Sequence, residues 1–248
     1  MRKNINNLYV LILIFLIQFK SNTQTIHIGA TSIWTLTNQK VRMVNSTDDF
    51  SSNGLVGIFS YEQILKNQKL SLFATYFGFR GYTWIKYREG SVWDSGGVGF
   101  VVGDGHGGVD VRRYDIGVSY NLLNPKKKFY IKPYFALGLQ TSKINGREFG
   151  ANFFKANGPE YFELEPIRVE SFNTTQLVPT VGLKTGFILW KRIDIDYTIL
   201  ATYGYKSYQN MYYKYAYKGV PQEEAIFQGK GTGMFFSLNI GYRIFKLK

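Results

Sequence analysis

Residues 234–245 read Met-Phe-Phe-Ser-Leu-Asn-Ile-Gly-Tyr-Arg-Ile-Phe, and this stretch decides the fold class. Large apolar residues recur at every second position from Met234 to Ile244, and the alternate positions hold polar residues such as Asn239 and Arg243. Successive side chains of a strand point to opposite faces, so the alternation predicts a strand with one apolar and one polar face. The stretch is also long enough to cross a bilayer as a tilted strand, which takes about 9–11 residues.

The same alternation recurs through the chain, so we expect an all-β protein of one domain. Strands are expected at residues 25–36, 53–63, 69–86, 109–122, 128–143, 174–190, 192–207 and 232–245. The connections between them alternate between short turns and long loops, as in outer-membrane barrels with short periplasmic turns. We therefore predict an up-and-down antiparallel transmembrane β-barrel of eight strands, with both termini on the periplasmic side.

Two alternatives to this fold are open. A ten-stranded barrel would result if the long loop at residues 144–173 held an extra hairpin. A soluble calycin-like barrel would show the opposite polarity, with an apolar interior and a polar outside. The segment at residues 70–79 is bulky on both faces, which predicts either a bulge or phenylalanines at 77 and 79 that point into the barrel.

The N-terminus has the pattern of a secretory signal. Arg2 and Lys3 precede an apolar run from Leu8 to Phe19, which is shorter than the roughly 20 residues of a spanning helix. We place a cleaved signal peptide at residues 1–24 and the barrel at residues 25–248, with an uncleaved anchor helix as the alternative. Removing the signal lowers the formal charge from +13 to +10, because it contains Arg2, Lys3 and Lys20 and no acidic residue.

Charged residues fall on the polar faces of the expected strands and are predicted to meet inside the barrel. They are Arg113, Asp115, Lys132, Lys184, Asp194, Asp196, Lys206 and Arg243. An eight-stranded barrel has an interior that side chains just fill, and buried charges must pair there. We expect Lys184 near Asp196 and Arg243 near Asp194, in a salt-bridged plug. A narrow polar path for ions or solutes is the alternative.

Aromatic residues gather in the last long connection, where they alternate with lysines. They are Tyr208, Tyr212, Tyr213, Tyr215 and Tyr217. Tyrosine favours membrane–water interfaces, so this group of extracellular-loop aromatics is expected to form an upper aromatic girdle that merges into strands extending above the membrane. As a binding surface, tyrosine with lysine would suit an extracellular saccharide or protein ligand.

No motif indicates a cofactor, a metal or nucleic acid. The chain has no cysteine, and its two histidines, His27 and His106, are far apart in sequence. Glycine-rich residues 103–108 lack the helix and the Lys-Ser/Thr of a phosphate-binding loop. RNA-binding signatures are missing, and an exported chain would not meet nucleic acid. His106 with Asp104 and a nearby serine could imitate a lipid-modifying triad in outline, although triads are judged by geometry.

From Thr25 to Lys248 the chain resembles the small outer-membrane barrels typified by the OmpA, OmpX and OmpW transmembrane domains. More closely, it is similar to the generic outer-membrane β-barrel family of Bacteroidota. The resemblance rests on the signal, the architecture and the closing strand, and it implies outer-membrane lipid, lipopolysaccharide and the barrel-assembly machinery as partners. Such barrels usually end in an aromatic residue, whereas Phe245 here is followed by Lys-Leu-Lys.

Three functions are compatible with this sequence. The first is a structural or surface-interaction barrel with a plugged interior and long extracellular loops. The second is a narrow pore or a transporter with a lateral path for a hydrophobic molecule. The third is a lipid-modifying enzyme. We favour the first, which predicts no enzyme activity.

Overall fold

The computed structural model describes residues 23–41, 46–47, 49–65, 69–80, 86–87, 109–125, 127–144, 154–156, 162–217 and 219–244. The elements in these ranges are strands joined by turns and short coil segments. The prediction of an all-β chain is therefore confirmed. Within the same ranges, no helix has the length and apolar content needed to cross a membrane. The predicted signal segment lies outside these ranges except for Thr23 and Gln24, which already belong to the first strand and pair with Ile64 and Gln63.

Eight antiparallel strands close into a barrel, because the last strand pairs with both its predecessor and the first strand. In order around the barrel they are β1 (Thr23–Val41), β3 (Asp49–Ile64), β4 (Leu70–Arg80), β6 (Val109–Tyr120), β7 (Phe129–Ile144), β10 (Thr175–Leu189), β11 (Ile193–Thr202) and β14 (Ala225–Arg243). All eight match the strands predicted from the sequence, although several are longer or shorter. The predicted eight-stranded barrel is confirmed.

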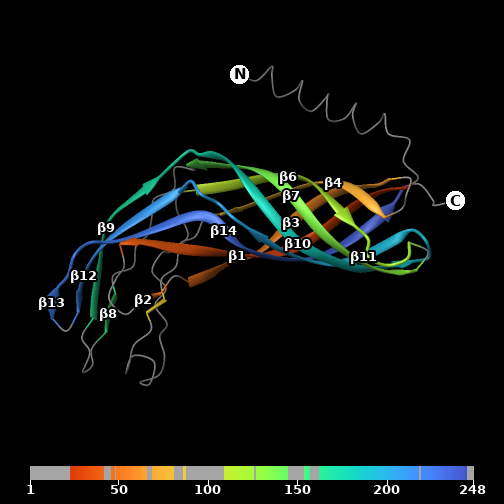
Figure 1. Cartoon of the computed structure of the whole chain (residues 1–248). Helices are drawn as coiled ribbons and strands as arrows, with labels where there is room; N and C mark the ends of the chain where they lie inside the picture. Colours follow the sequence, from red (N-terminus) through yellow and green to blue (C-terminus); the bar gives the residue numbers. More distant parts are fainter. Residues whose placement is uncertain are drawn as a thin grey trace, which may run out of the picture.

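The start of β1 and the end of β14 lie at the same end of the barrel as the short connections (Figure 1). At one of these, Trp190 and Lys191 have φ angles of 47° and 61°. Two consecutive left-handed residues form the tight type I′ turn that matches the twist of a hairpin. By the rule that outer-membrane barrels have short periplasmic turns, this end is periplasmic.

The same sheet continues beyond the barrel wall at the opposite, extracellular end (Figure 1). The continuation consists of β8 (Phe154–Ala156), β9 (Phe162–Ser171), β12 (Gln209–Tyr217) and β13 (Val220–Pro221). β11 stops at Thr202, so the first part of β14 pairs with β12 instead, and β12 pairs with β9. We call β8, β9, β12, β13 and residues 225–229 of β14 the extracellular sheet. A separate short pair joins β2 (Ser46–Thr47) to β5 (Lys86–Tyr87).

The extracellular sheet corrects two predictions. The connection before the last strand is not a loop throughout, because β12 and the start of β14 form a hairpin there. The extra hairpin that a ten-stranded barrel would need is present as β8 and β9, but β9 pairs with β12 and does not enter the barrel. β8 and β9 can pair only beyond the extracellular end of the barrel wall, because β7 and β10, which the hairpin connects, are already hydrogen-bonded to each other within the wall.

The outside of the barrel is apolar and the inside is polar. Leu55 and Ile28 on the outside are 77% and 67% exposed, whereas His27 and Thr31 on the same β1 strand are 1% exposed inside. Aromatic residues flank the apolar band, with Trp34 toward the extracellular end and Trp190 at the periplasmic turn. This polarity is the reverse of a soluble barrel and is typical of a chain that faces lipid. It excludes the calycin-like alternative.

β4 alternates regularly, without a bulge. Phe73, Phe77 and Phe79 all point inward, and Phe77 is only 1% exposed. The bulge that the sequence left open is therefore absent from β4, and the phenylalanines fill the interior.

The pairing between β3 and β4 ends early, which leaves a seam in the barrel wall. The two strands pair only from Ile58–Phe77 to Ile64–Ser71. Toward the extracellular end β3 continues to pair with β1, and β4 continues to pair with β6, but the two no longer pair with each other.

Candidate functional site

The periplasmic half of the barrel interior contains a cluster of ion pairs centred on Glu62 of β3. Lys132 Nζ donates a hydrogen bond to Glu62 Oε1, and Lys184 Nζ donates to Oε2 at 2.9 Å. His27 Nε2 lies 3.6 Å from the same Oε2 atom. Glu62 is 3% exposed, so this carboxylate depends on neighbouring cations rather than on water.

Asp196 of β11 completes the cluster from the other side. Its Oδ2 atom lies 3.3 Å from Lys184 Nζ and 3.0 Å from His27 Nδ1. Its Oδ1 atom accepts hydrogen bonds from Asn239 Nδ2 at 2.7 Å and Thr198 Oγ1 at 3.0 Å. Strands β1, β3, β7, β10 and β11 each contribute one residue to the cluster, and β14 adds the hydrogen bond from Asn239, so these contacts join most of the barrel wall. We call Glu62, Asp196, Lys132, Lys184 and His27 the central ion cluster.

A second ion pair lies nearer the periplasmic end. Arg243 Nη2 is 3.2 Å from Asp194 Oδ2, and Tyr130 donates its phenol hydrogen to Asp194 Oδ1 at 2.6 Å. Arg243 and Asp194 are on the paired strands β14 and β11, and Tyr130 reaches in from β7. These three side chains occupy the interior near the periplasmic turns.

A third ion pair lies on the extracellular side of the central ion cluster. Arg113 Nε donates to Asp115 Oδ1 at 2.7 Å, and Arg113 Nη2 donates to Thr180. The guanidinium carbon is also 5.4 Å from the ring centre of Phe235 and 5.8 Å from that of Phe77. Arg113 is fully buried, and its charge is stabilised by both a carboxylate and aromatic rings.

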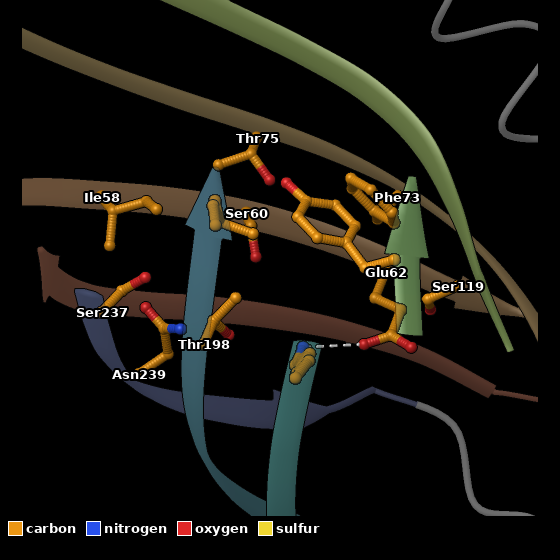
Figure 2. A pocket seen from close by; sticks show the side chains of 12 residues that line it. Ile58, Ser60, Glu62, Phe73, Thr75, Ser119, Thr198, Ser237 and Asn239 are labelled. Carbon is orange, nitrogen blue, oxygen red and sulfur yellow. Dashed lines mark hydrogen bonds and ion pairs between the residues drawn. The ribbon is translucent and has the colours of Figure 1, made fainter. Parts of the chain in front are cut away.

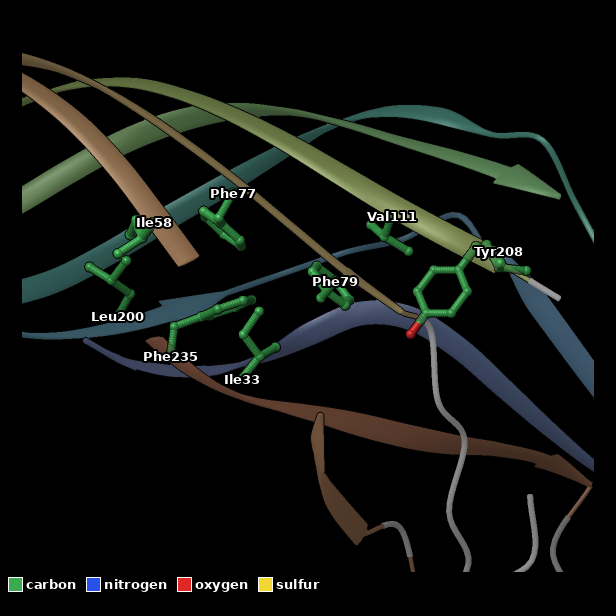
Figure 3. Close-up of a cluster of buried hydrophobic side chains, with 9 residues drawn as sticks. Ile33, Ile58, Phe77, Phe79, Val111, Leu200, Tyr208 and Phe235 are labelled. Carbon is green, nitrogen blue, oxygen red and sulfur yellow. The ribbon is translucent and has the colours of Figure 1, made fainter. Parts of the chain in front are cut away.

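Beyond Arg113 the interior becomes apolar. Buried side chains from β1, β3, β4, β6, β11 and β14 pack together there, along with one from the connection before β12 (Figure 3). They are Ile33, Ile58, Phe77, Phe79, Val109, Val111, Leu200, Tyr208 and Phe235. Leu200, which breaks the polar face of its strand in the sequence, fills a place in this apolar cluster. The extracellular half of the described interior thus contains an apolar cluster, bordered by buried polar side chains such as Gln140 and Gln176.

A small cavity lies between the central ion cluster and the apolar cluster. Its volume is about 40 Å³, and Glu62, Thr198, Asn239 and Ser237 are among the residues that line it (Figure 2). A cavity needs about 10–15 Å³ on this scale to hold one water molecule, so this one accommodates a few waters and no larger solute. The described interior therefore contains charged, polar and apolar side chains in successive layers.

Seven of the eight residues predicted to form an interior charge network lie inside the barrel, in the three ion groups above. They carry four positive charges (Arg113, Lys132, Lys184, Arg243) and three negative charges (Asp115, Asp194, Asp196). Sequence reasoning missed Glu62, which supplies the fourth negative charge. Glu62 could have been found from the period of two on β3, which places it on the same inward face as Ser60 and Ile58.

Lys206 was assigned to this network wrongly. It lies on the exposed surface beyond the end of β11, where its Nζ atom donates to the carbonyl of Thr175 at 3.1 Å. The sequence extended the strand to residue 207, but the chain leaves the barrel after Thr202 to enter β12. Gln176 fixes the segment between β11 and β12, because its side chain accepts hydrogen bonds from the backbone N–H groups of Tyr205 and Lys206.

The predicted loop aromatics divide into two groups. Tyr208 and Tyr213 are fully buried, and Tyr215 is only 7% exposed, so these three do not form the exposed ligand surface that was the alternative interpretation. They are the inward positions of β12 and of the segment before it, and β12 is a strand above the membrane, as the girdle interpretation expected. Burial raises the pKa of the Tyr213 phenol. The side chain of Tyr217 lies outside the described residues.

Tyr212 lies on the other face of β12 and is partly exposed. The Arg168 guanidinium stacks over its ring at 4.1 Å, and Glu170 accepts a hydrogen bond from the Tyr212 hydroxyl at 2.7 Å. Arg168 Nε also lies 3.2 Å from Glu170 Oε1. We call these three residues the Arg–Tyr–Glu stack; it fixes a planar, charged and partly exposed surface on β9 and β12. His106 and the glycine-rich residues 103–108 lie outside the described residues.

Comparisons with known proteins add structural similarity without sequence similarity. No family model and no curated protein matches the chain. Among solved structures, the chain is similar to the outer membrane protein OprG from Pseudomonas aeruginosa, at 9% identity and a TM-score of 0.49 over 92% of this chain and 98% of that one. It is also similar to Neisserial surface protein A, at 9% identity and a TM-score of 0.43 over 89% of this chain and 95% of that one.

The assignment to a class follows from the strand pairing and the polarity of the two faces. Eight antiparallel strands close on themselves, the outward face is apolar, and the inward face is charged and paired. These are the properties that the hydrocarbon core of a membrane imposes on strands that cross it. The chain is a small eight-stranded outer-membrane β-barrel.

Proposed function

We propose that this barrel has a structural and surface-interaction role, with a closed interior and a binding surface on the extracellular sheet. The observation that carries the proposal is the layered interior, in which three ion groups and an apolar cluster fill the space between the strands. A solute moving along the axis would have to separate Lys184 from Glu62 and Asp196 and then displace Phe77 and Phe235. Breaking a buried ion pair costs about 3–5 kcal/mol, which opposes a constitutive pore.

The binding surface we propose is the exposed face around the Arg–Tyr–Glu stack. Ion pairing and stacking restrict Arg168 and Tyr212 before any ligand arrives, which lowers the entropy cost of binding. Exposed Lys214 lies two residues beyond Tyr212 on the same face of β12. A planar ring flanked by cations suits a saccharide or an acidic protein segment.

Two measurements test this proposal. The refolded barrel in a planar bilayer should give no reproducible conductance steps; steps that change in Lys184→Ala would show that the charges line a path. Binding should then be measured on cells that display the barrel, using arrays of saccharides and of proteins. Arg168→Ala/Tyr212→Ala should abolish binding of any ligand found, because it removes the stacked guanidinium and ring, whereas Lys128→Ala at the periplasmic end should leave it unchanged.

One observation favours a second function, lateral passage of a hydrophobic molecule. A groove of about 390 Å³ opens at the β3–β4 seam and reaches Phe79 and Val111 of the apolar cluster. Gly78 faces this groove. The nearest atom to a Cβ added at this position would be the backbone oxygen of Val111, at 3.4 Å, so a larger side chain could be placed there. If the seam conducts, Gly78→Phe should slow uptake of an apolar dye by barrel-containing vesicles, and Ala201→Phe on the outside of β11 should not.

A further inference from the structure

Three cations lie on the lipid-facing side of adjacent strands, close to the β3–β4 seam. Arg80 is on β4, Arg112 on β6 and Lys143 on β7, and all three are exposed. In the strand register Arg80 is opposite Asp110, which is in turn opposite Lys143, and Arg112 is opposite Gly78. The two arginines are therefore diagonal neighbours on one face, at a spacing of about 7–8 Å. We call Arg80, Arg112 and Lys143 the basic patch.

The two arginines differ from the other arginines described. Arg113, Arg168 and Arg243 each have a carboxylate within 3.2 Å, and Arg192 donates to the Tyr242 hydroxyl at 2.8 Å. Within the described ranges, Arg80 and Arg112 have no ion pair or hydrogen bond from their side chains. Asp110, the acidic residue between them, has an interaction of its own. Two unpaired guanidinium groups at this spacing can both donate to one anion that bears several oxygens.

The height of the basic patch relative to the membrane is set by a pair of tyrosines. Tyr76 and Tyr114 are direct cross-strand partners, with ring centres 4.9 Å apart. Tyrosine rings on the outside of a membrane barrel lie at the lipid headgroup boundary. Arg112 follows two residues farther toward the extracellular end, or about 7 Å along the strand. This is the level at which lipid phosphates lie, just outside the hydrocarbon.

The groove at the seam supplies the space for a headgroup. The groove is lined by Tyr76, Arg80, Asp110, Arg112 and Gly78. Because Gly78 has no side chain, the space between the two arginines is left open. The groove's volume of about 390 Å³ is open to the outside of the barrel. Apolar residues lie directly below it on the outer surface, including Ile116, which is 58% exposed. An occupant therefore meets cations at the top and hydrocarbon-facing surface beneath.

We propose that the basic patch binds the phosphate of an outer-leaflet lipid, with Arg80 and Arg112 as the phosphate ligands and Lys143 as a supporting charge. The lipid's acyl chains lie against the apolar outside of β4 and β6. This arrangement accounts for two arginines without protein partners at a membrane boundary, since a bound phosphate supplies their missing acceptors. The site does not rest on the surface-interaction role proposed above, because it lies on the outside of the wall and away from the extracellular sheet. It shares its groove with the lateral passage considered as a second function.

The test uses lipid A as the probe, with its two phosphates intact or removed. The refolded mature barrel in neutral detergent is titrated with each form, and binding is measured by native mass spectrometry. The variant is Arg80→Gln/Arg112→Gln. The matched control is Lys127→Gln/Lys128→Gln, which removes the same charge from exposed positions at the periplasmic end. Folding of each variant is checked by the heat-dependent gel shift of intact barrels.

We expect the arginine variant to bind phosphorylated lipid A about 30-fold more weakly, and the control variant to bind as the unmodified barrel does. Removing the phosphates should weaken binding to the unmodified barrel by a similar factor. Equal losses in both variants would show general charge attraction and overturn the site. Unchanged binding in the arginine variant, or full displacement of the lipid by millimolar inorganic phosphate, would also overturn it.

Discussion

The substitution Glu62→Gln tests whether the central ion cluster holds the barrel closed. The change keeps the size of the side chain and removes its charge. Lys132 loses its carboxylate partner, and Lys184 keeps only Asp196 at 3.3 Å. Because Glu62 is 3% exposed, water cannot replace the lost carboxylate without entering the interior.

The expected loss of stability follows from the burial of these charges. Removing one partner of a buried ion pair costs about 3–5 kcal/mol, chiefly because an unpaired charge remains. The matched control is Glu170→Gln in the extracellular sheet, where the Arg168–Glu170 pair has a similar length of 3.2 Å but side chains that are 57% and 39% exposed. An exposed pair contributes about 0–1 kcal/mol, so the control should be nearly silent.

The assay is the free energy of unfolding in urea, measured for barrels folded into lipid vesicles under reversible conditions. The double variant Glu62→Gln/Lys132→Gln removes one charge of each sign and leaves Lys184 with Asp196. It should recover about 1–3 kcal/mol of the loss as a coupling energy. A loss below about 1 kcal/mol for Glu62→Gln alone would refute the reasoning, since it would mean that water or neighbouring groups stabilise the lysines. A double variant that is no better than the single one would refute the proposed pairing.

Two further predictions concern the turn and the extracellular sheet. Lys191→Gly should stabilise the barrel by about 1–2 kcal/mol in the same urea assay. The reason is that Lys191 has a left-handed φ of 61°, which glycine adopts without strain. Unchanged or lower stability would contradict this explanation. Tyr213→Ala should increase protease cleavage and amide exchange in β9 and β12, because Tyr213 is fully buried in the extracellular sheet, while the heat-dependent gel shift of the barrel persists. The control is Lys214→Ala, at the exposed next position. Equal protection in the two variants would contradict a packed sheet.

Much of the barrel could be predicted because its alternation reflects one local rule. Each strand that crosses lipid must present apolar side chains outward, so the period of two is visible in sequence, as in β14 from Met234 to Arg243. The short turns follow from the same strands, and the Trp190–Lys191 turn fixes which residues of β10 and β11 face each other. That register places Lys184 on the strand next to Asp196, which made the predicted pair possible.

The interior partners that come from distant strands could not be predicted. Glu62 and Lys132 are 70 residues apart, and Glu62 and Lys184 are 122 apart. Their contact depends on the closure of the barrel, which brings β3 opposite β7 and β10 across the lumen. No local pattern distinguishes a charge that meets a partner there from one that faces water.

The sequence by itself determined the class of fold and the inward or outward position of most side chains, because both follow from local polarity in contact with lipid. The choice between eight and ten strands was made by the tertiary structure, in which β9 pairs with β12 and stays out of the barrel. Only the tertiary structure decided where strands end and what they pair with beyond the membrane. Lys206 lies outside the interior, and Tyr213 is buried, because β11 ends at Thr202 and β12 pairs with β14 beyond that point. Above the rim, both faces of a strand can be covered by protein, so polarity no longer indicates which way a side chain points.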